Sequence, residues 1–481
     1  MTGVDGATRA SAWDQWQVCV VGLGVAGYAA ADALMQVGAS VRVVDSSDSA
    51  AVRAKGDVLA TLGADVRTGL DGRLGSALDG CDLMVVSPGL PPQHAWITEC
   101  LERSIPVWGE LELAWRLRPS VDPAPWLCVT GTNGKTTATL MLDSMLRAGG
   151  YSSVAAGNIG TSLVDVVMHD SPDVIAVEVG APQLPFVTSM SPLASVCINI
   201  APDHIDHFGS FDSYWGAKAR VYRLTQAAAV FNADEPDTRA MVEDADVIDG
   251  CRAIGITLST PSIGMLGVVD GLLVDRAFID DRRERAQELA SVADVQPAAP
   301  HNVVNALAAA ALARAFGVAP AAVRDGLRTF VPAHHRISDV GTVAGVRFVD
   351  DSKATNAHAA LASVAAYPSV VWIAGGLAKG QDFDDLVQRI APRLRGVVLL
   401  GRDRAVIAEA LSRHAPEVPV VEVDRTDTGV METVVDLALQ HAQAGDTVLL
   451  APGCASWDMF RDYAQRGELF AAAARERGAT T

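Results

Sequence analysis

The stretch Gly131-Thr132-Asn133-Gly134-Lys135-Thr136-Thr137 constrains the fold of this chain more than any other. The apolar run before it, 126–130, predicts a buried strand, and the run after it, 136–147, predicts a helix that ends at the glycine pair 149–150. A strand, a tight turn and a helix start direct backbone N–H groups and the positive end of the helix dipole at one point. Lys135 adds a full positive charge there. The sequence therefore predicts a phosphate site, with the hydroxyl of Thr136 placed to ligate magnesium.

This stretch departs from the strict nucleotide-loop pattern, because Val129 stands where that pattern has its first glycine. A plain glycine-rich turn is the alternative interpretation. The sequence Lys135-Thr136-Thr137, which opens a helix directly after a buried strand, favours the phosphate site over that alternative.

Length and charge exclude several classes of protein. At 481 residues the chain is long enough for about three domains, and 49% hydrophobic residues can fill several cores. The formal net charge of -19 argues against nucleic-acid or anionic-membrane partners, since both require a basic surface. The apolar runs end well before about 18 residues, so we expect no membrane span. Seven irregularly spaced cysteines indicate reduced core residues in a cytoplasmic protein.

A second glycine turn lies near the N-terminus. The predicted strand Gln17–Val21 runs into Gly22-Leu23-Gly24-Val25-Ala26-Gly27, and a second predicted strand, Ser40–Val44, ends at Asp45. This spacing is typical of a dinucleotide-binding fold, in which the acid reaches a ribose. An NAD enzyme, another nucleotide site and a plain glycine turn all remain open at this point. A third predicted strand, 83–86, ends in Ser87-Pro88-Gly89 at the same sheet edge.

Two proline-containing joints, 118–125 and 331–333, divide the chain into three α/β domains. We expect the domains to be 1–120, 121–332 and 333–481. The first and third should be Rossmann-like, and the central one should be a parallel sheet like that of P-loop ATPases. The remaining predicted strands are 173–179, 195–200, 228–231, 347–350, 370–374, 396–400, 418–423 and 447–450, with a hairpin at 268–273. The charged run 280–288 should be a solvated loop or helix face.

Polar residues at predicted strand ends form the candidate chemical site. Glu178 closes the strand 173–179, where α/β folds hold their ligands, and its carboxylate suits magnesium. The loop after the next strand, 199–207, contains two acids and two histidines, among them His204. A paired structural acid at 178 and a structural histidine at 204 are the alternatives. Lys218, read from sequence alone, is a helix-surface lysine.

These motifs resemble those of the Mur ligases, which make amide bonds through an acyl phosphate, and they follow the family order over nearly the whole chain. The family's motifs are matched by the shorter glycine loop at 131–137, by Glu178 with Gln183, by the segment 199–207 and by Lys218. Gly180-Ala181-Pro182 replaces the family's Ser-Ser-Phe, and Pro202 replaces an acid. The resemblance implies ATP, two magnesium ions and a carbamylated Lys218 that presents a carboxylate-like anion to the metal.

The resemblance extends to the ends of the chain. The segment His301-Asn302-Val303-Val304-Asn305 is similar to the family's adenine-side segment, although the two Asn side chains would equally suit a helix cap. His335-Arg336 and the run 350–356 match family strings closely, and 375–380 with 451–458 resemble the amino-acid-binding parts of the D-glutamate-adding member. Tyr463 stands where we would expect Phe.

The resemblance implies a role for each of the following residues. The catalytic set is Lys135, Glu178, His204, Lys218 and Lys353, and the metal ligands are Thr136, Glu178, His204 and Lys218. ATP would bind Gly131, Thr132, Asn133, Gly134, Lys135, Thr136, Thr137, Asn302, Asn305, Arg336 and Asp351. The uridine-linked substrate would bind Gly22, Leu23, Gly24, Val25, Gly27, Asp45, Ser46, Gly89 and Asn158, and the amino acid would bind Thr355, Lys379, Ser456 and Tyr463.

The implied activity is ATP-dependent ligation of D-glutamate to UDP-N-acetylmuramoyl-L-alanine in the cytoplasm, as a step of peptidoglycan precursor synthesis. Another Mur ligase, a folylpolyglutamate synthetase and a catalytically silent scaffold are the alternatives. The glycine turn at 22–27 speaks against a folylpolyglutamate synthetase, which lacks that domain. An NAD dehydrogenase has no use for Lys135 and Thr136.

Overall fold

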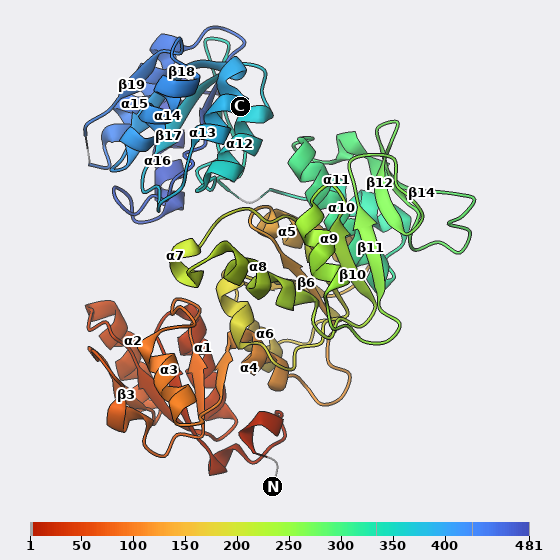
Figure 1. The fold of residues 1–481 in the computed structure, drawn as a ribbon, viewed down its shortest axis with the longest axis vertical. Coiled ribbons are helices and arrows are strands. Elements are labelled where there is room, and N and C mark those ends of the chain that lie inside the picture. The colour runs from red at the N-terminus through yellow and green to blue at the C-terminus, as the bar shows by residue number, and fades with distance from the viewer. Residues whose placement is uncertain (1–2, 333, 426, 481) are drawn as a thin grey trace. The chain divides into compact units, whose positions relative to one another are not determined.

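The computed structural model describes residues 3–332, 334–425 and 427–480, which form three α/β sheets (Figure 1). The chain divides into two compact units. The first contains the residues up to Ala298 together with Asn302–Phe330, and it holds two of the sheets. The second contains Ala299–His301 and the residues from Val331 onward, and it holds the third sheet. Ala333, where we expect the third domain to begin, lies outside the described residues.

The first sheet has five parallel strands in the order β3-β2-β1-β4-β5. Its strands are β1 (Gln17–Val21), β2 (Ser40–Val44), β3 (Asp65–Arg67), β4 (Leu83–Val86) and β5 (Val107–Gly109). Its helices are α1 (Val25–Gln36), α2 (Ala50–Thr61), α3 (Ala95–Glu102) and α4 (Glu110–Arg116). Alternate residues of β1 face opposite ways, so Val18 and Val20 pack with α1 and α2, whereas Cys19 and Val21 pack with α3.

The central sheet has nine strands in the order β14-β13-β12-β11-β10-β9-β6-β8-β7, and all pairs are parallel except β12/β13 and β13/β14. The strands are β6 (Trp126–Thr130), β7 (Ser153–Gly157), β8 (Val174–Glu178), β9 (Ala194–Cys197), β10 (Ala228–Asn232), β11 (Arg252–Ile256), β12 (Met265–Val269), β13 (Leu272–Asp275) and β14 (Gln287–Ser291). The helices are α5 (Lys135–Ala148), α6 (Leu163–His169), α7 (Ile205–Phe208), α8 (Phe211–Ala219), α9 (Pro236–Glu243), α10 (Pro300–Phe316) and α11 (Pro320–Thr329). The helices α5, α10 and α11 cover one face, and α6 and α8 cover the other.

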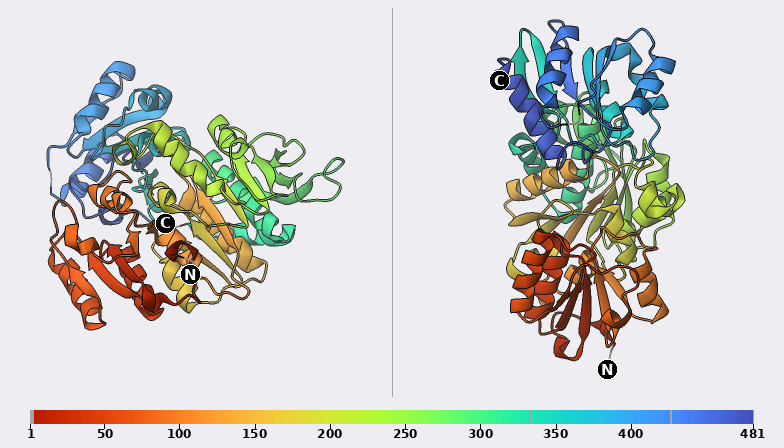
Figure 2. Two further views of the ribbon diagram at one scale, coloured as in Figure 1. Left: turned by 60° about the horizontal axis from the view of Figure 1, so that its bottom comes forward. Right: turned by 90° about the vertical axis from the view of Figure 1, so that its left-hand side faces the viewer.

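The third sheet has six strands in the order β15-β16-β20-β17-β18-β19, and only β15/β16 is antiparallel. The strands are β15 (Ser338–Val343), β16 (Val346–Asp350), β17 (Val370–Gly375), β18 (Leu394–Leu400), β19 (Val420–Glu422) and β20 (Thr447–Leu450). The helices are α12 (Ala357–Ala365), α13 (Asp384–Ile390), α14 (Arg404–His414), α15 (Val430–His441) and α16 (Tyr463–Glu476). Helices α12, α13 and α14 pack on one face, and α15 and α16 on the other. Figure 2 shows these layers from two further sides.

Two buried carboxylates on α4 join the first sheet to the central one. Glu110 Oε1 accepts hydrogen bonds from Ser162 Oγ (2.9 Å) and Leu163 N (3.0 Å) at the start of α6. Glu112, which is fully buried, accepts from backbone and hydroxyl groups of Thr188 and Ser189. The two sheets also share one hydrophobic core, which explains why they form a single compact unit.

Within the described part of the chain, no helix has the length and apolar character needed to cross a membrane. The charged run 280–288 forms turns that lead into β14 at Gln287, so it is a loop and the start of a strand.

Candidate active site

The loop between β6 and α5 has the form that its glycines require. Gly131 and Gly134 have φ values of 154° and 83°, which a residue with a Cβ rarely adopts. Asn199, which follows β9, holds the loop in place: its Oδ1 accepts from Asn133 N (2.9 Å), and its carbonyl oxygen accepts from Thr132 N (3.0 Å). The predicted strand, turn and helix start are therefore present, and the N-terminus of α5 points into the turn.

Two lysines converge on one carbonyl oxygen of this loop. Lys135 Nζ donates to Gly131 O at 2.9 Å and to Thr132 O at 3.0 Å, and Lys218 Nζ donates to Gly131 O at 2.7 Å. Lys218 is 1% exposed. Burial, together with repulsion from Lys135, lowers the pKa of Lys218 to about 7. The prediction of a helix-surface lysine, made from sequence alone, is therefore wrong at this position: α8 packs against the loop and takes Lys218 inside.

Glu178 is the last residue of β8 and is 2% exposed. Its Oε1 accepts from Asn158 Nδ2 at 2.8 Å. Its Oε2 is buried and has no hydrogen-bond partner among the described residues. A buried carboxylate oxygen without a partner is costly unless a cation or a ligand donor reaches it. This geometry favours a ligand role over that of a paired structural acid.

His204 lies on the loop after β9 with φ 53°, and its Nε2 is 3.8 Å from Asp203 Oδ2. Its imidazole is 6.2 Å from the ring of Tyr214, whose hydroxyl lies 2.9 Å from Thr132 Oγ1. His204 thus lies beside the residues that support the glycine loop. No group of three or more His, Cys, Asp or Glu side chains arranged to hold a metal occurs in the parts of the chain that the structure describes.

Asn305 of α10 lies against the glycine loop, and Asn302 bonds it from the preceding turn of the helix. A Cβ on Gly134 would lie 2.2 Å from Asn305 Oδ1, so this close approach is possible only with glycine. Asn305 Nδ2 donates to Asn302 Oδ1 (3.2 Å), and Asn302 Nδ2 donates to Pro297 O (3.2 Å). Because α10 already begins at Pro300, neither asparagine occupies its N-cap position, and the capping alternative is wrong.

The N-terminal glycine turn is also present. A Cβ on Gly27 would lie 1.8 Å from Gly22 O, so α1 approaches the end of β1 as closely as the dinucleotide fold requires. Asp45 stabilises the turn directly: its Oδ2 accepts from Leu23 N and its Oδ1 from Ser47 N, both at 2.7 Å. Gly24 is the N-cap of α1, Val25 is its first residue, and Ser46 and Gly89 are exposed at the same edge.

Two residues near this turn were missed by the sequence analysis. The Oγ of Ser87 is buried without a partner among the described residues and faces the positions of Gly22 and Gly27. Lys55 Nζ, from α2, donates to Leu23 O at 3.1 Å. A hydroxyl and an ammonium beside a helix N-terminus suit a pyrophosphate. The position of Ser87 at the end of β4 was a signal, but nothing in the spacing of Lys55 distinguishes it from a surface lysine.

Three loops meet at one edge of the third sheet, because they follow the neighbouring parallel strands β16, β20 and β17. Backbone hydrogen bonds join them: Gly453 N donates to Ala354 O (2.8 Å), and Leu377 and Ala455 form a β-bridge. Arg466, which is 1% exposed, fixes two of the loops by donating to Ser352 O (2.7 Å) and Cys454 O (3.1 Å). The predicted residues Lys353, Thr355, Lys379 and Ser456 all lie on these loops.

Both predicted lysines at this edge make cation–π contacts with aromatic rings. Lys353 Nζ is 3.7 Å from the ring centroid of Tyr463, and Lys379 Nζ is 4.5 Å from that of Trp457. Asp351 is buried, which raises its pKa to about 6, and it accepts hydrogen bonds from Ser363 Oγ and Ile337 N. Arg336 lies close enough for its charge to lower the pKa of Asp351 in opposition to burial.

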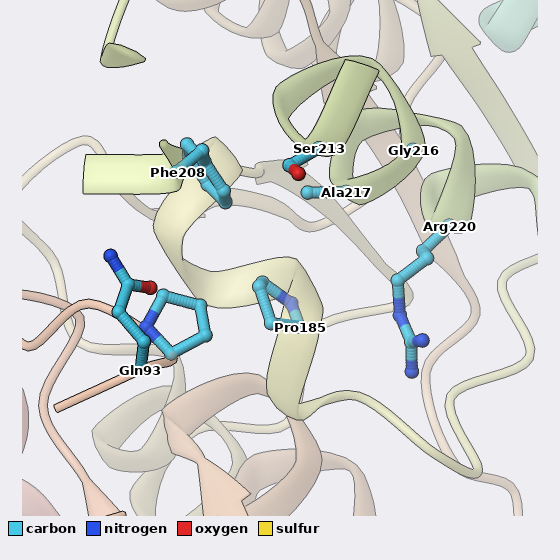
Figure 3. A pocket seen from close by; sticks show the side chains of 8 residues that line it. Gln93, Pro185, Phe208, Ser213, Gly216, Ala217 and Arg220 are labelled. Carbon is cyan, nitrogen blue, oxygen red and sulfur yellow. The ribbon is translucent and has the colours of Figure 1, made fainter. Parts of the chain in front are cut away.

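A cavity of about 510 Å³ lies in the first unit beside α8. Figure 3 shows Gln93 and Pro185 facing the residues Ser213, Ala217 and Arg220 of that helix region. Gln93 Nε2 donates to His207 O at 3.0 Å, so a loop of the first sheet contacts α7, the helix that directly follows His204. The lining combines proline and phenylalanine surfaces with a few polar groups, as in many small-molecule sites.

Comparison with known proteins identifies the family. Residues 16–109 match a model described as Mur ligase MurD-like, N-terminal domain; 129–313 match Mur ligase middle domain; and 335–454 match Mur ligase, glutamate ligase domain. A UDP-N-acetylmuramoylalanine--D-glutamate ligase of Streptomyces avermitilis is 55% identical over 97% of this chain and 99% of its own. The chain belongs to the Mur ligase family. A ligase of the same name from Mycolicibacterium smegmatis is 43% identical over 95% of this chain and 96% of its own.

Solved structures share the Mur ligase fold at low sequence identity. The UDP-N-acetylmuramate-alanine ligase MurC of Thermotoga maritima aligns with a TM-score of 0.56 at 18% identity, covering 96% of this chain and 99% of that one. The MurF ligase of the same organism, solved in complex with ADP, aligns with a TM-score of 0.52 at 16% identity, covering 84% and 92%. The expected three-domain α/β fold of this family is confirmed.

Proposed function

We propose that this Mur ligase uses ATP to join D-glutamate to UDP-N-acetylmuramoyl-L-alanine in peptidoglycan precursor synthesis. Near full-length identity of 55% to a ligase of that name carries the proposal. Its reaction would take place in the cytoplasm, where ATP is the phosphoryl donor. We assign the uridine-linked substrate to residues 1–120, ATP to 121–332 and the amino acid to 333–481.

The glycine loop supports the ATP assignment. Backbone N–H groups at the start of α5 and the ammonium of Lys135 suit the outer phosphates, and Asn302 with Asn305 offers amides for a purine edge. Lys135 now donates to two carbonyl oxygens of its own loop, so a triphosphate would exchange those contacts for phosphate oxygens. We also assign to ATP the remaining residues of the loop, which are Gly131, Thr132, Asn133, Gly134, Thr136 and Thr137.

The residues present fit a magnesium ion. Glu178 Oε2 is a buried acceptor without a partner among the described residues, and a cation would remove the cost of burying it. We assign Thr136, Glu178, His204 and a carbamylated Lys218 as ligands of two magnesium ions, with His204 on the second. Bound there, magnesium would neutralise charge on the transferring phosphoryl group.

Carbamylation of Lys218 is chemically consistent with its surroundings. The amine nitrogen would form a bond to the carbon of carbon dioxide and release one proton, which requires the neutral amine. Burial in a helix packed against the loop favours that neutral form. The product is an anion, so it would turn repulsion between Lys218 and Lys135 into attraction.

The reaction would then proceed by positioning and charge neutralisation. The alanine carboxylate attacks the γ-phosphorus, and the bond to ADP breaks. The amine of D-glutamate attacks the acyl carbon, phosphate leaves, and the amine gives up its proton. Lys135 and Lys353 would counter the charge of the phosphoryl group, and Arg336 and Asp351 would hold the nucleotide. Thr355, Lys379, Ser456 and Tyr463 would hold D-glutamate.

The N-terminal glycine turn would hold the uridine-linked substrate, with its pyrophosphate at the start of α1 near Ser87 and Lys55. Asn158, whose amide orients Glu178, would contact the same substrate at its other end. The cavity between Gln93 and α8 offers room along this path.

The decisive experiment measures phosphate release with ATP, magnesium and UDP-N-acetylmuramoyl-L-alanine over a panel of amino acids. Among the amino acids of the panel, we expect only D-glutamate to cause phosphate release. In Lys135→Ala the rate of release should fall about a thousandfold while the fold is retained. Release with a different amino acid would reassign the substrate. No release with any of them would indicate a silent scaffold. Intact mass and activity before and after removal of carbon dioxide would test the carbamate separately.

A further inference from the structure

Trp457 is the most unusual aromatic residue of the second unit, because its side chain is 66% exposed. Tryptophan buries a large apolar area on contact and is enriched at binding interfaces. Trp457 directly follows Ser456, which is 3% exposed, and so lies at the edge of the sheet where the three loops meet.

The ring of Trp457 contacts a charged group from another loop. Lys379 Nζ lies 4.5 Å from the ring centroid, within the range of a cation–π interaction. The β-bridge between Leu377 and Ala455 fixes this arrangement. Leu377 lies two positions before Lys379, and Ala455 lies two positions before Trp457. The contact is therefore set by the backbones of two loops.

The backbone of Lys379 is itself constrained. Its φ of 52° lies in the left-handed region, which is unfavourable for a residue with a Cβ. The side chain is exposed, so burial does not explain why this conformation is kept. A conformation of this kind, which directs an ammonium over an exposed ring, indicates a binding function.

We propose that Trp457 is a positioning residue for the acidic amino-acid substrate, because its ring holds the Lys379 ammonium where the substrate's side-chain carboxylate enters. This inference rests on the proposed function for the identity of the substrate. The carboxylate would pair with an ammonium that is already in place, so less side-chain entropy is lost on binding. A fixed ammonium also selects for the length of the acidic side chain.

Kinetics would test this role. A cation–π contact at an exposed site implies that Trp457→Ala raises the KM for D-glutamate about two- to fivefold, with kcat changed by less than about twofold. Trp457→Phe keeps an aromatic ring and should recover most of that loss. Val406→Ala, on the exposed face of α14, is the control for removing a surface apolar side chain, and its KM should match that of the unmodified protein. An unchanged KM in Trp457→Ala would overturn the proposal.

Selectivity provides a second kinetic readout. D-Aspartate is one methylene shorter than D-glutamate, and a fixed ammonium should discriminate against it. We expect Trp457→Ala to lower the ratio of kcat/KM values for D-glutamate and D-aspartate, because its Lys379 can follow the shorter side chain. A ratio equal to that of the unmodified enzyme would contradict this.

Fluorescence separates this inference from the proposed function. The chain has nine tryptophans, so the signal of Trp457 is the difference between the unmodified protein and Trp457→Phe. With the uridine-linked substrate and ADP present, D-glutamate should change emission in the unmodified protein and leave Trp457→Phe unchanged. Equal responses in the two proteins would overturn the role of Trp457 even if ligation occurs. If no ligation occurs but the fluorescence response still depends on Trp457, the proposed function is overturned, and Trp457 remains part of a site for an acidic ligand.

Discussion

At the scale of single residues, Gly134 is the position where the fold and the candidate site depend on each other most directly. It adopts φ 83° and leaves room for Asn305, since a Cβ would lie 2.2 Å from the Asn305 side-chain oxygen. Gly134→Ala should therefore displace either the loop or Asn305. We expect phosphate release to fall by about a hundredfold or more, because a misplacement of about 1 Å in a positioned site has that effect.

The matched control is Gly150→Ala, just beyond the other end of α5. Gly150 has a similar φ of 86°, but a Cβ there would have nothing within 4 Å. Its substitution should lower stability by about 1 kcal/mol and leave turnover intact. Equal losses of turnover in both variants would mean that backbone strain, and not the contact with Asn305, causes the defect.

The sequence identified those site residues whose chemistry depends on their neighbours along the chain. Lys135 and Thr136 follow a glycine turn, and Glu178 ends an apolar run, so spacing was sufficient. Asn199 and Lys55 could not be assigned in this way, since their contacts depend on how β9 and α2 pack beside the glycine turns. Ser87 stands at a predicted strand end, but only the structure shows that its hydroxyl is buried without a partner among the described residues. Lys218 is the clearest case, because only the packing of α8 shows that its ammonium is buried.

At the scale of elements, the attachment of α4 to the central sheet depends on the buried carboxylate of Glu112. Its two oxygens accept from Thr188 N, Thr188 Oγ1, Ser189 N, Ser189 Oγ and Arg116 Nε. Burial alone would raise the pKa of Glu112, but these hydrogen bonds together lower it. In Glu112→Gln an amide NH₂ would face N–H or O–H donors. We expect the free energy of unfolding at pH 7 to fall by about 2–3 kcal/mol, measured by urea denaturation of the full chain.

Glu110, two residues earlier, is the matched comparison. Burial raises its pKa, and its Oε1 accepts from Ser162 Oγ and Leu163 N, two hydrogen bonds that an amide oxygen can also accept. Glu110→Gln should change stability at pH 7 by less than about 1 kcal/mol. Below pH 4.5 the stability that Glu112 contributes is lost as it protonates, so Glu112→Gln should approach the unmodified protein there. A Glu112→Gln deficit that grows on acidification would contradict this assignment.

Hydrophobic runs predicted most of the strands that are buried on both faces, although they missed the interior strand β11, and they failed more often at the edges of the sheets. The predicted β1, β2, β4, β6 and β20 have the observed bounds. The edge strand β3 is only three residues long and partly exposed, and β14 is polar and adjoins a charged run, so neither has an apolar signal. The predicted strand 418–423 shortens to Val420–Glu422, again at an edge.

At the scale of the whole molecule, the candidate residues divide between two compact units. The first unit contains the glycine turn at 22–27, the loop at 131–137, Asn158, Glu178 and Lys218. The second unit contains Lys353, Lys379 and Ser456. Neither unit contains the complete proposed site. We therefore expect ligation to require the intact chain, whereas binding of individual substrates need not.

This division predicts how ligands act on unfolding. Uridine diphosphate should bind residues of the first unit alone, so in scanning calorimetry it should raise the transition of that unit and leave that of the second in place. At a hundredfold excess over Kd the added stability is about 2.7 kcal/mol, because a ligand that binds only the native state shifts the equilibrium by mass action. Uridine provides the control, since it keeps the nucleoside but lacks the pyrophosphate that the start of α1 and Lys55 would bind. A shift of the second transition by uridine diphosphate would show that the units unfold together or that the nucleotide binds elsewhere. Absence of any shift would remove the N-terminal glycine turn as its site.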